Sequence, residues 1–198
     1  MRFLAIDFET ATGSRDSACA VGVALVDGGR IESSASYLIR PPQNRYSPLN
    51  IAVHGITPDM TAGAAAFADV MDAVLEWADG LPLVAHNASF DMSVLRAGFE
   101  RADRVSPPRD YYCTLLMSRT ALPGLPDYRL PTVLSSVGGT MTDHHDPRAD
   151  AEACAEIALA LGRLATADTI EGLGARVGMQ AGRLSGRGYQ PCRCSSGR

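Results

Sequence analysis

RFLAIDFET, residues 2–10, is the stretch that decides the fold, because it joins a buried strand to two acidic side chains. Its apolar run predicts a strand over residues 2–8 inside a sheet. Asp7 and Glu9 are two positions apart, so their side chains leave the same face of that strand. Two acids at the end of a buried strand repel each other and lose hydration, which is costly unless a cation compensates. Taken alone, such a pair is more often the end of a strand that reaches into solvent.

The segments that follow predict a mixed α/β sheet flanked by helices. Two more strands are expected at 18–27 and 31–39, with Asp27-Gly28-Gly29 as the hairpin turn. Hydrophobic spacing then predicts helices before residue 54 and at 67–78, 89–102, 115–121, 130–137 and 147–164, and strands at 81–85 and 111–114. Three strands followed by alternating helices and strands are typical of an α/β domain.

Two further acids lie near the starts of predicted helices, on their apolar faces. The positions three, four, seven and eight residues after Asp91 and after Asp150 are apolar or small, so both acids point inward. Asp146 and Pro147 mark the start of the second of these helices as N-cap and first residue. Either acid alone could be a helix cap. These two acids, taken together with Asp7 and Glu9 on the first strand, favour one shared site.

Oxygen ligands from carboxylates suit Mg²⁺ or Mn²⁺ better than zinc. Two such ions about 3.5 to 4 Å apart stabilise the attacking and the leaving oxygen of a phosphoryl displacement. The site also needs a base for water, and imidazole titrates close to neutral pH. His144 and His145 both precede the helix of Asp150, and the residues themselves do not decide between them.

Three motifs at this point resemble those of a known family. DFET (7–10), HNASFD (86–91) and HDPRADA (145–151) are similar, in order and spacing, to the exonuclease motifs of the DEDD superfamily. A histidine five residues before the last aspartate is typical of the DEDDh branch, which includes the proofreading epsilon subunit of bacterial DNA polymerase III, ribonuclease T and oligoribonuclease. The resemblance covers about residues 1–165 and selects His145 over His144. HGIT (54–57) also resembles a segment of epsilon-like members.

The resemblance implies a ribonuclease H-like fold and 3′ to 5′ removal of nucleoside 5′-monophosphates from single-stranded DNA or RNA ends. It implies that two Mg²⁺ or Mn²⁺ ions are held by four carboxylates, Asp7, Glu9, Asp91 and Asp150. His145 would deprotonate the attacking water. The expected substrate-binding residues are Phe8, Thr10, His54, Asn87 and Phe90. Each of these also has a structural interpretation, since the aromatic rings could be core, Asn87 a turn residue and His54 a polar helix end.

Composition divides the chain into an exonuclease domain, residues 1–167, and an arginine-containing flexible tail, residues 168–198. Up to Ala175 the chain has 13 arginines and 22 acids, whereas the rest has five arginines and no acid. An acidic body is not typical of a generic nucleic-acid binder, but bound cations would offset part of its charge. Cys192 and Cys194 lack the further ligands that a zinc site needs, which favours reduced surface thiols.

The expected setting is the cytoplasm, since the five cysteines are odd in number and scattered. No segment has the pattern of a secretory signal or of a membrane span. Two alternatives to the exonuclease stay open: an accessory protein that binds a polymerase or nucleic acid, and a phosphodiesterase of small nucleotides. The preferred sugar is also open, as is the choice between a monomer and a homodimer.

Overall fold

The chain folds around one main sheet. The structure, a computed structural model, describes residues 1–141, 143–186 and 188–194. Within these residues the main sheet has seven strands in the order β3-β2-β1-β4-β5-β7-β8. They are β1 (Phe3–Thr10), β2 (Ala18–Asp27), β3 (Arg30–Leu38), β4 (Leu83–Ala85), β5 (Ser106–Cys113), β7 (Gly182–Gly186) and β8 (Gly188–Gln190). A smaller sheet pairs β6 (Met179–Gln180) with β9 (Arg193–Cys194).

The first three strands form an antiparallel meander, β1 with β2 and β2 with β3. Between β2 and β3, Gly28 and Gly29 have φ angles of 57° and 78°. Left-handed backbone at both central residues is what a two-residue hairpin turn needs, and glycine adopts it without strain. The predicted hairpin is therefore confirmed, and the first strand runs on to Thr10, so that Asp7 and Glu9 lie within it.

Parallel strands extend the sheet on the other side of β1. β4 pairs with β1 and β5 pairs with β4, both in parallel. Parallel neighbours have their carboxyl ends at the same edge of the sheet, where the chain turns into the next helix. The helical segments are η1 (Pro42–Asn44), α1 (Pro48–His54), α2 (Pro58–Thr61), α3 (Phe67–Ala78), α4 (Ser89–Arg101), α5 (Thr114–Ala121), α6 (Leu130–Ser136), α7 (Pro147–Leu164) and α8 (Ile170–Arg176).

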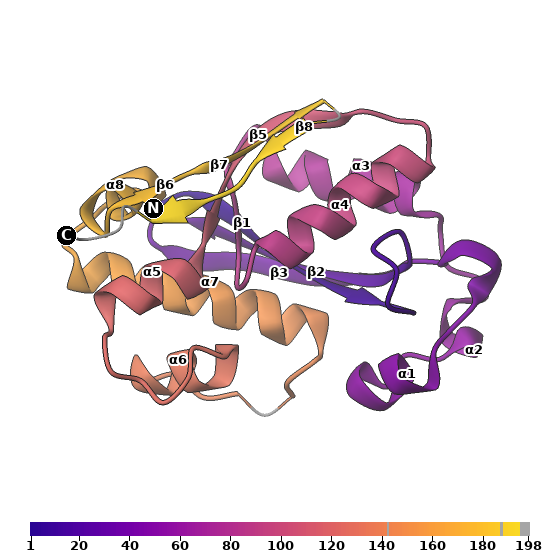
Figure 1. The fold of residues 1–198 in the computed structure, drawn as a ribbon, viewed down its shortest axis with the longest axis horizontal. Helices are drawn as coiled ribbons and strands as arrows, with labels where there is room; N and C mark the ends of the chain where they lie inside the picture. The colour runs from indigo at the N-terminus through magenta and orange to yellow at the C-terminus, as the bar shows by residue number, and fades with distance from the viewer. Residues whose placement is uncertain (142, 187, 195–198) are drawn as a thin grey trace.

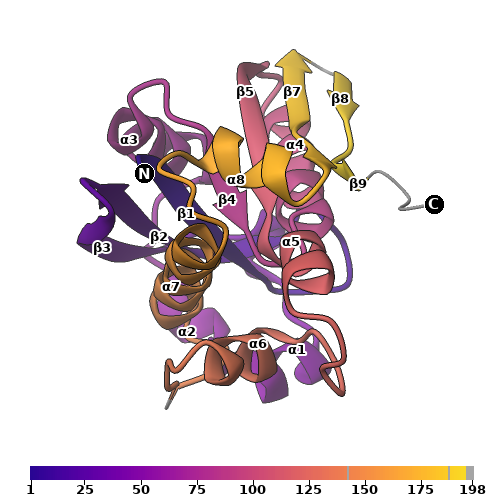
Figure 2. The same ribbon diagram turned by 90° about the vertical axis from the view of Figure 1, so that its left-hand side faces the viewer.

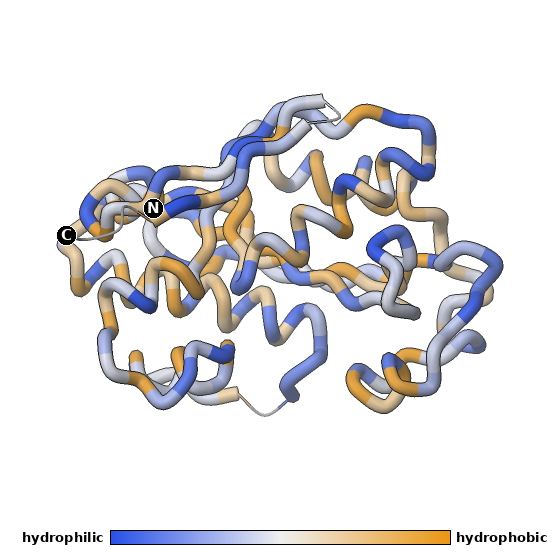
Figure 3. The backbone as a smooth tube through the Cα atoms, viewed as in Figure 1, coloured by the Kyte–Doolittle hydropathy of each residue, from blue (hydrophilic) through white to orange (hydrophobic). Residues whose placement is uncertain are grey.

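Helices cover both faces of the sheet, as Figures 1 and 2 show. α7 packs across β1, β2 and β3, while α3 and α4 pack together on the opposite face. The hydropathy tube in Figure 3 is orange along the inner strands and the inward sides of these helices, and blue in many of the connecting loops. The predicted mixed α/β sheet flanked by helices is confirmed. Among the described residues no helix has both the length and the apolar character to cross a bilayer.

The start of α7 lies directly on β2 because Gly22 has no side chain. A Cβ atom at Gly22 would lie 1.8 Å from the carbonyl oxygen of Pro147, closer than any real contact. The two backbones therefore touch, as they can only where glycine stands. In Figure 1, α1 lies at the same end of the molecule as this start of α7.

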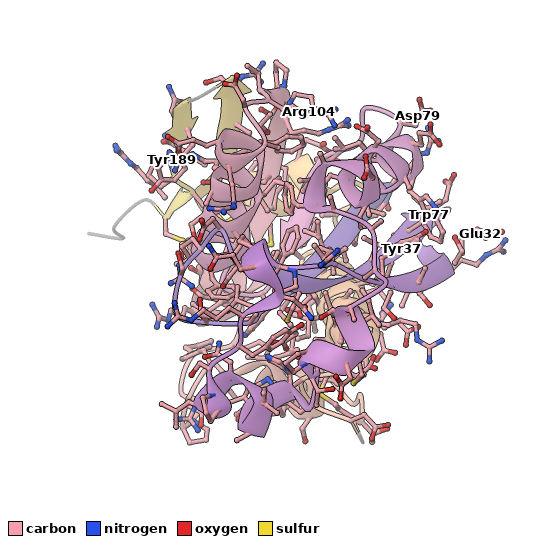
Figure 4. All side chains as sticks on the ribbon, turned by 90° about the vertical axis from the view of Figure 1, so that its right-hand side faces the viewer. Glu32, Tyr37, Trp77, Asp79, Arg104 and Tyr189 are labelled. Atoms are coloured by element: carbon pink, nitrogen blue, oxygen red, sulfur yellow. The ribbon has the colours of Figure 1, made fainter. Side chains whose placement is uncertain are left out.

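The C-terminal segment contains a helix and four short strands that the sequence analysis did not predict. β7 pairs with β5 and extends the main sheet, and Figure 2 shows β7 and β8 in yellow beside β5. Tyr189 on β8 and Tyr37 on β3 mark the two edges of that sheet in Figure 4. The boundary at residue 167 and the flexibility of the tail stay predictions, and Arg187 and residues 195–198 lie outside the described residues.

Cys192 and Cys194 are less exposed than the sequence analysis expected. Both thiols are free and half-buried, and their side chains pack against the core. The Cys192 thiol donates a hydrogen bond to the carbonyl oxygen of Tyr111 at 3.3 Å. Burial raises the pKa of Cys192 to about 12, so this thiol stays protonated at neutral pH.

Candidate active site

Asp7 and Glu9 point from β1 toward α7. Asp7 lies opposite Gly22 in the antiparallel pair with β2, and Glu9 lies opposite Ala20. Residues directly opposite each other in such a pair present their side chains to the same face. Because Gly22 faces the start of α7, both acids face it too. The two acidic side chains of β1 therefore point toward the helix that carries Asp150.

Asp150 is held at the start of α7 by the local chain. Asp146 caps the helix, with the main-chain amide of Ala149 donating to its Oδ1 at 2.9 Å, and Pro147 is the first helical residue. The predicted cap is confirmed. Asp150 is 4% exposed, and its Oδ2 accepts a 3.2 Å hydrogen bond from the main-chain amide of His145.

Asp91 reaches the same region from α4, on the opposite face of the sheet. Its side chain is 1% exposed, and its Oδ1 accepts a hydrogen bond of 3.0 Å from the main-chain amide of Phe8. The residues expected on its apolar face, Val94, Leu95, Gly98 and Phe99, are all buried. Asp91 thus points inward, as predicted, and meets β1 between the two acids of that strand.

The four carboxylates disfavour one another's charge. Burial and the neighbouring acids raise the pKa of Asp7 far above its ordinary value. Burial is also the main cause that raises the pKa of Glu9 to about 8 and that of Asp91 to about 7. The pKa of Asp150 is raised by burial as well, although contacts with His144 and His145 oppose the rise. An added cation would favour the ionised form of all four.

These side chains fit divalent cations. Carboxylate oxygens of Asp7, Glu9 and Asp150 lie within 4.8 Å of one another, close enough to share an ion. His144, His145 and Asp150 form a second such group, which shares Asp150 with the first. Oxygen donors in the first group match what Mg²⁺ and Mn²⁺ prefer. The acids repel one another and are partly buried. A cation bound between them offsets both the repulsion and the loss of hydration.

His144 and His145 both lie at the carboxylates. Their rings stack with centroids 3.8 Å apart. His144 Nδ1 lies 3.2 Å from the Asp150 carboxylate, whereas His145 Nδ1 lies 3.7 Å from Glu9 Oε1. His145 has φ of 75°, a left-handed backbone that is uncommon for residues other than glycine and turns the chain just before α7. Burial and the neighbouring His144 lower the pKa of His145, which leaves its ring neutral near pH 7.

A pocket of about 620 Å³ opens over the carboxylates. This size falls in the range that holds small organic ligands. Besides Asp7, Glu9, Asp150 and the two histidines, its lining includes all five expected substrate-binding residues, Phe8, Thr10, His54, Asn87 and Phe90. The pocket therefore brings the three sequence motifs and the HGIT segment to one place.

The five expected substrate-binding residues differ in what they offer the pocket. The Phe8 ring is buried and stacks on Phe67 with centroids 6.2 Å apart, so most of it belongs to the core. Phe90 is half-buried, with the Arg15 guanidinium 4.3 Å from its ring centroid. Asn87 has φ of 64°, which fits its turn between β4 and α4.

His54 ends α1 and ties that helix to β1. Its Nδ1 accepts a hydrogen bond from the main-chain amide of Ile56 at 3.0 Å, so the proton lies on Nε2. Nε2 then donates to the carbonyl oxygen of Thr10 at 3.2 Å. Burial lowers the pKa of His54, in keeping with a neutral ring. The side chain thus lines the pocket and also serves as the polar helix end that the sequence allowed.

The sequence analysis missed one whole wall of the pocket. This wall comes from α5, α6 and the loop between them, and its residues are Leu115, Arg119, Tyr128, Arg129 and Leu130. α1 adds the exposed apolar side chains of Leu49 and Val53 at the rim. These segments have no motif and no spacing that relates them to the carboxylates, so the sequence carries no signal for them.

His86 was quoted within a motif but given no role, and it connects that wall to the site. Its Nδ1 accepts from the Thr114 hydroxyl at 2.9 Å, and its Nε2 donates to the carbonyl oxygen of Tyr128 at 2.8 Å. Burial lowers the pKa of His86 to about 4, so the ring is neutral at physiological pH. Both ring nitrogens are engaged, which makes His86 a bridge inside the protein and no base for water.

Comparison with known proteins gives one matching family and many relatives. The model of a family described as Exonuclease matches residues 4–158. A PolC-type DNA polymerase III of Oceanobacillus iheyensis is 36% identical over 157 residues, which cover 76% of this chain and 11% of that protein. The chain therefore spans about a tenth of the length of this curated relative.

Solved structures share the fold. Exonuclease X in complex with 5′ overhanging duplex DNA is 25% identical with a TM-score of 0.69, and the match covers 89% of this chain and 99% of that one. The nuclease domain of 3′hExo, a DEDDh family member bound to rAMP, is 22% identical with a TM-score of 0.70 over 82% of this chain and 92% of that one. The predicted ribonuclease H-like fold is confirmed.

Proposed function

This chain belongs to the exonuclease family, and we propose that it is a member of the DEDDh branch that removes nucleotides from the 3′ end of single-stranded nucleic acid with two divalent cations. The products are nucleoside 5′-monophosphates and a strand that is one nucleotide shorter. Asp7, Glu9, Asp91 and Asp150 hold the cations, and His145 is the base. Mg²⁺ and Mn²⁺ suit the donors.

One observation carries this proposal. Oxygen atoms of Asp7, Glu9 and Asp150 lie within 4.8 Å of one another at a pocket that takes a ligand of nucleotide size. A polyanion would be repelled by such a cluster unless cations were bound there. The same cations that make the cluster favourable therefore make phosphate binding possible.

The reaction follows from the placement of the side chains. When bound, the cations supply Lewis-acid stabilisation of the charge that develops on the phosphate oxygens and on the leaving oxygen. The neutral His145 ring takes a proton from the attacking water, whose oxygen forms a bond to phosphorus while the bond to the 3′ oxygen of the preceding nucleotide breaks. That oxygen leaves as the new 3′ hydroxyl after protonation from solvent.

His145 suits the role of base better than His144. The Nδ1 atom of His144 is occupied by the Asp150 carboxylate at 3.2 Å, which holds the ring against the cluster. His145 is fixed by its main-chain amide, which donates to Asp150, and its ring Nδ1 lies 3.7 Å from Glu9 Oε1, beyond hydrogen-bond distance. Its lowered pKa keeps the ring ready to accept a proton at neutral pH.

Association with a polymerase is the second candidate function. The relative of Oceanobacillus iheyensis is a DNA polymerase III, and this chain matches 11% of its length. An exonuclease that acts beside a polymerase would remove the last nucleotide added. The two functions are compatible, because proofreading uses the same hydrolysis at the same pocket.

The test follows a 5′-labelled single-stranded oligonucleotide, as DNA and as RNA, with Mg²⁺, Mn²⁺ or chelator. Both sugars are used, since one structural neighbour binds DNA and another binds rAMP. We expect a metal-dependent ladder that shortens from the 3′ end, with nucleoside 5′-monophosphates as products. Asp7→Asn should abolish it, and His145→Ala should lower kcat by about a hundredfold or more.

His144→Ala is the matched control, because it removes the neighbouring imidazole. We expect it to lower kcat by about tenfold or less, through looser positioning of Asp150. Equal losses in the two histidine variants would overturn the assignment of the base. Cleavage of a small phosphodiester, with no cleavage of any oligonucleotide, would replace the exonuclease by a phosphodiesterase of small nucleotides.

A further inference from the structure

Two arginines line the pocket, and both lie on the wall formed by α5, α6 and the loop between them. Their charge is opposite to that of the carboxylates. Arg119 comes from the last turn of α5, and Arg129 immediately precedes α6. Both side chains are exposed. Among the described residues, neither guanidinium lies within ion-pair distance of a carboxylate, although the charge of Arg129 acts on the nearby Asp127 and helps to lower its pKa. Both guanidinium groups can therefore still bind a phosphate.

The wall that carries these arginines is held in place. His86 bridges the Thr114 hydroxyl at the start of α5 and the Tyr128 carbonyl next to Arg129, at 2.9 and 2.8 Å. The Tyr128 hydroxyl also donates to the carbonyl oxygen of Leu122 at 2.9 Å, which closes the loop between α5 and α6. The Arg119 guanidinium lies 5.8 Å from the Tyr128 ring centroid. The chain segments that carry the two guanidinium groups are therefore held at a fixed place relative to the carboxylates.

We propose that Arg119 and Arg129 bind backbone phosphates on the 5′ side of the scissile bond, so that the chain selects oligonucleotides over esters of single nucleotides. This inference rests on the proposed function. A 3′-terminal nucleotide has a single phosphate, and that phosphate is the one under attack at the carboxylates. Any further phosphate that reaches the pocket therefore belongs to the strand on the 5′ side. Arginine is the side chain best suited to bind it, because its planar fork matches phosphate oxygens.

The charge of the molecule makes such a wall necessary. Up to Ala175 the chain has 13 arginines against 22 acids, so a polyanion gains nothing from the body as a whole. Bound cations would attract the scissile phosphate most strongly, and their attraction for phosphates further along the strand is screened over about 10 Å at ordinary salt. Two unpaired arginines in the same pocket supply the attraction for the phosphates that follow.

A test by binding does not depend on catalysis. Fluorescence anisotropy measures the affinity of a 5′-fluorescein single-stranded decanucleotide in Mg²⁺, over a range of salt concentrations, for proteins that carry His145→Ala to suppress cleavage, with the two arginines intact and with Arg119→Ala/Arg129→Ala. We expect the double variant to bind about tenfold or more weakly, and its plot of log Kd against log salt to lose about 0.7 in slope for each phosphate contact. The double lysine variant should recover part of the affinity, because it keeps the charge. Unchanged affinity and slope in the alanine variant would overturn the inference.

Arg163→Ala is the matched control for binding. Arg163 is exposed, has no ion pair among the described residues and lies at the end of α7 far from Asp150. Its removal takes away the same charge from another surface, so we expect unchanged affinity and slope. A loss equal to that of the pocket variants would show that any arginine suffices, and would also overturn the inference.

A kinetic test separates the two phosphate positions. The p-nitrophenyl ester of thymidine 5′-monophosphate has the scissile phosphate and none on its 5′ side. We expect the ratio of kcat/KM for the decanucleotide to that for the ester to fall about tenfold or more in the double variant. An equal loss on both substrates would place the arginines at the scissile phosphate and overturn the inference. A wild type that cleaves neither substrate, yet binds the strand through these arginines, would refute the proposed function and support the inference.

Discussion

The main-chain amide of Phe8 donates a hydrogen bond of 3.0 Å to Oδ1 of Asp91. β4 pairs with β1 at Leu4 and Ala5 and ends at Ala85, so it offers no partner to the amide of Phe8. The Asp91 side chain takes the place of the missing strand. One carboxylate therefore completes the sheet and, by our proposal, binds a cation.

The double role of Asp91 predicts different outcomes for two substitutions. Asp91→Asn keeps the oxygen that accepts from Phe8, whereas Asp91→Ala leaves that buried amide without a partner. We expect Asp91→Ala to have a free energy of unfolding about 1 to 3 kcal/mol below that of Asp91→Asn, measured by urea denaturation at pH 8. Both should lose exonuclease activity, because neither supplies a carboxylate. Equal stabilities would show that the hydrogen bond is not needed.

The raised pKa values predict that the metal-free protein loses stability as pH rises. Unfolded carboxyl groups are ionised above about pH 5, whereas the folded protein still binds protons at Glu9, with a pKa of about 8, and at Asp91, with a pKa of about 7. Stability falls wherever the folded state binds more protons than the unfolded state. We expect the free energy of unfolding in EDTA to fall between pH 7 and 8.5, by up to about 1.4 kcal/mol per pH unit for each carboxyl group that is still protonated in the folded state, and the Tm to fall with it.

Two controls identify the source of this fall in Tm. Glu9→Gln removes one of the titrating carboxyl groups and should flatten the pH profile. Added Mn²⁺ or Mg²⁺ should raise the Tm most at the upper end of the pH range, because the ions bind the ionised carboxylates. A Tm that stays constant or rises from pH 7 to 8.5 in chelator would contradict the prediction.

The parts of the fold that were predictable are those with local signals. The strands of the meander have apolar runs and a two-glycine turn, and α7 has a cap, a proline and an apolar stripe. The inward direction of Asp91 and Asp150 followed from the same spacing. Their convergence with Asp7 and Glu9 came from the resemblance of three motifs, since spacing within an element cannot place one element against another.

The parts that were missed depend on contacts between distant segments. β5 begins at Ser106, although Pro107 and Pro108 have no amide hydrogen for a sheet. The register with β7 is irregular between Ser106 and Arg109, which accommodates the prolines. β7 itself is rich in glycine and is placed by Gly182, where a Cβ would lie 2.1 Å from the Tyr111 ring. Such strands form because a neighbouring strand is present to pair with them, and no local sequence pattern predicts that pairing.

The close approach of β2 and α7 predicts that Gly22 cannot be replaced. A methyl group in Gly22→Ala would lie 1.8 Å from the Pro147 carbonyl oxygen, so the start of α7 must move away from β2. We expect a loss of about 3 kcal/mol in the free energy of unfolding. We also expect a lower affinity for divalent cations, because Asp150 moves with the helix. Urea denaturation and metal titration by calorimetry measure the two effects.

Gly63→Ala is the matched control for Gly22→Ala. Nothing lies within 4 Å of a Cβ at Gly63, and its φ is not left-handed. We expect its stability to stay within about 0.5 kcal/mol of the wild type. If both alanine variants were equally stable and bound metal equally, the backbone contact would not be what fixes Asp150.

The bridge made by His86 predicts an effect on the substrate-binding wall and on acid stability. His86→Ala leaves the Tyr128 carbonyl and the Thr114 hydroxyl without their partner, so we expect a loss of about 2 kcal/mol or more at pH 7. The folded pKa of about 4 lies below the unfolded value of about 6.5, so the unfolded state binds more protons between them. The contribution of His86 is therefore complete above about pH 6.5 and is lost as pH falls toward 4.

Subtraction isolates this contribution from that of the carboxylates, whose effect on stability has the opposite sign. The difference in free energy of unfolding between wild type and His86→Ala should shrink from pH 7 to pH 4.5, as measured by urea denaturation. The variant should also show a higher KM for a decanucleotide, with a smaller change for a mononucleotide ester, because the segments that carry Arg119 and Arg129 lose their common anchor. A difference that grows as pH falls would mean that the folded His86 is charged, which the two hydrogen bonds of its ring do not allow.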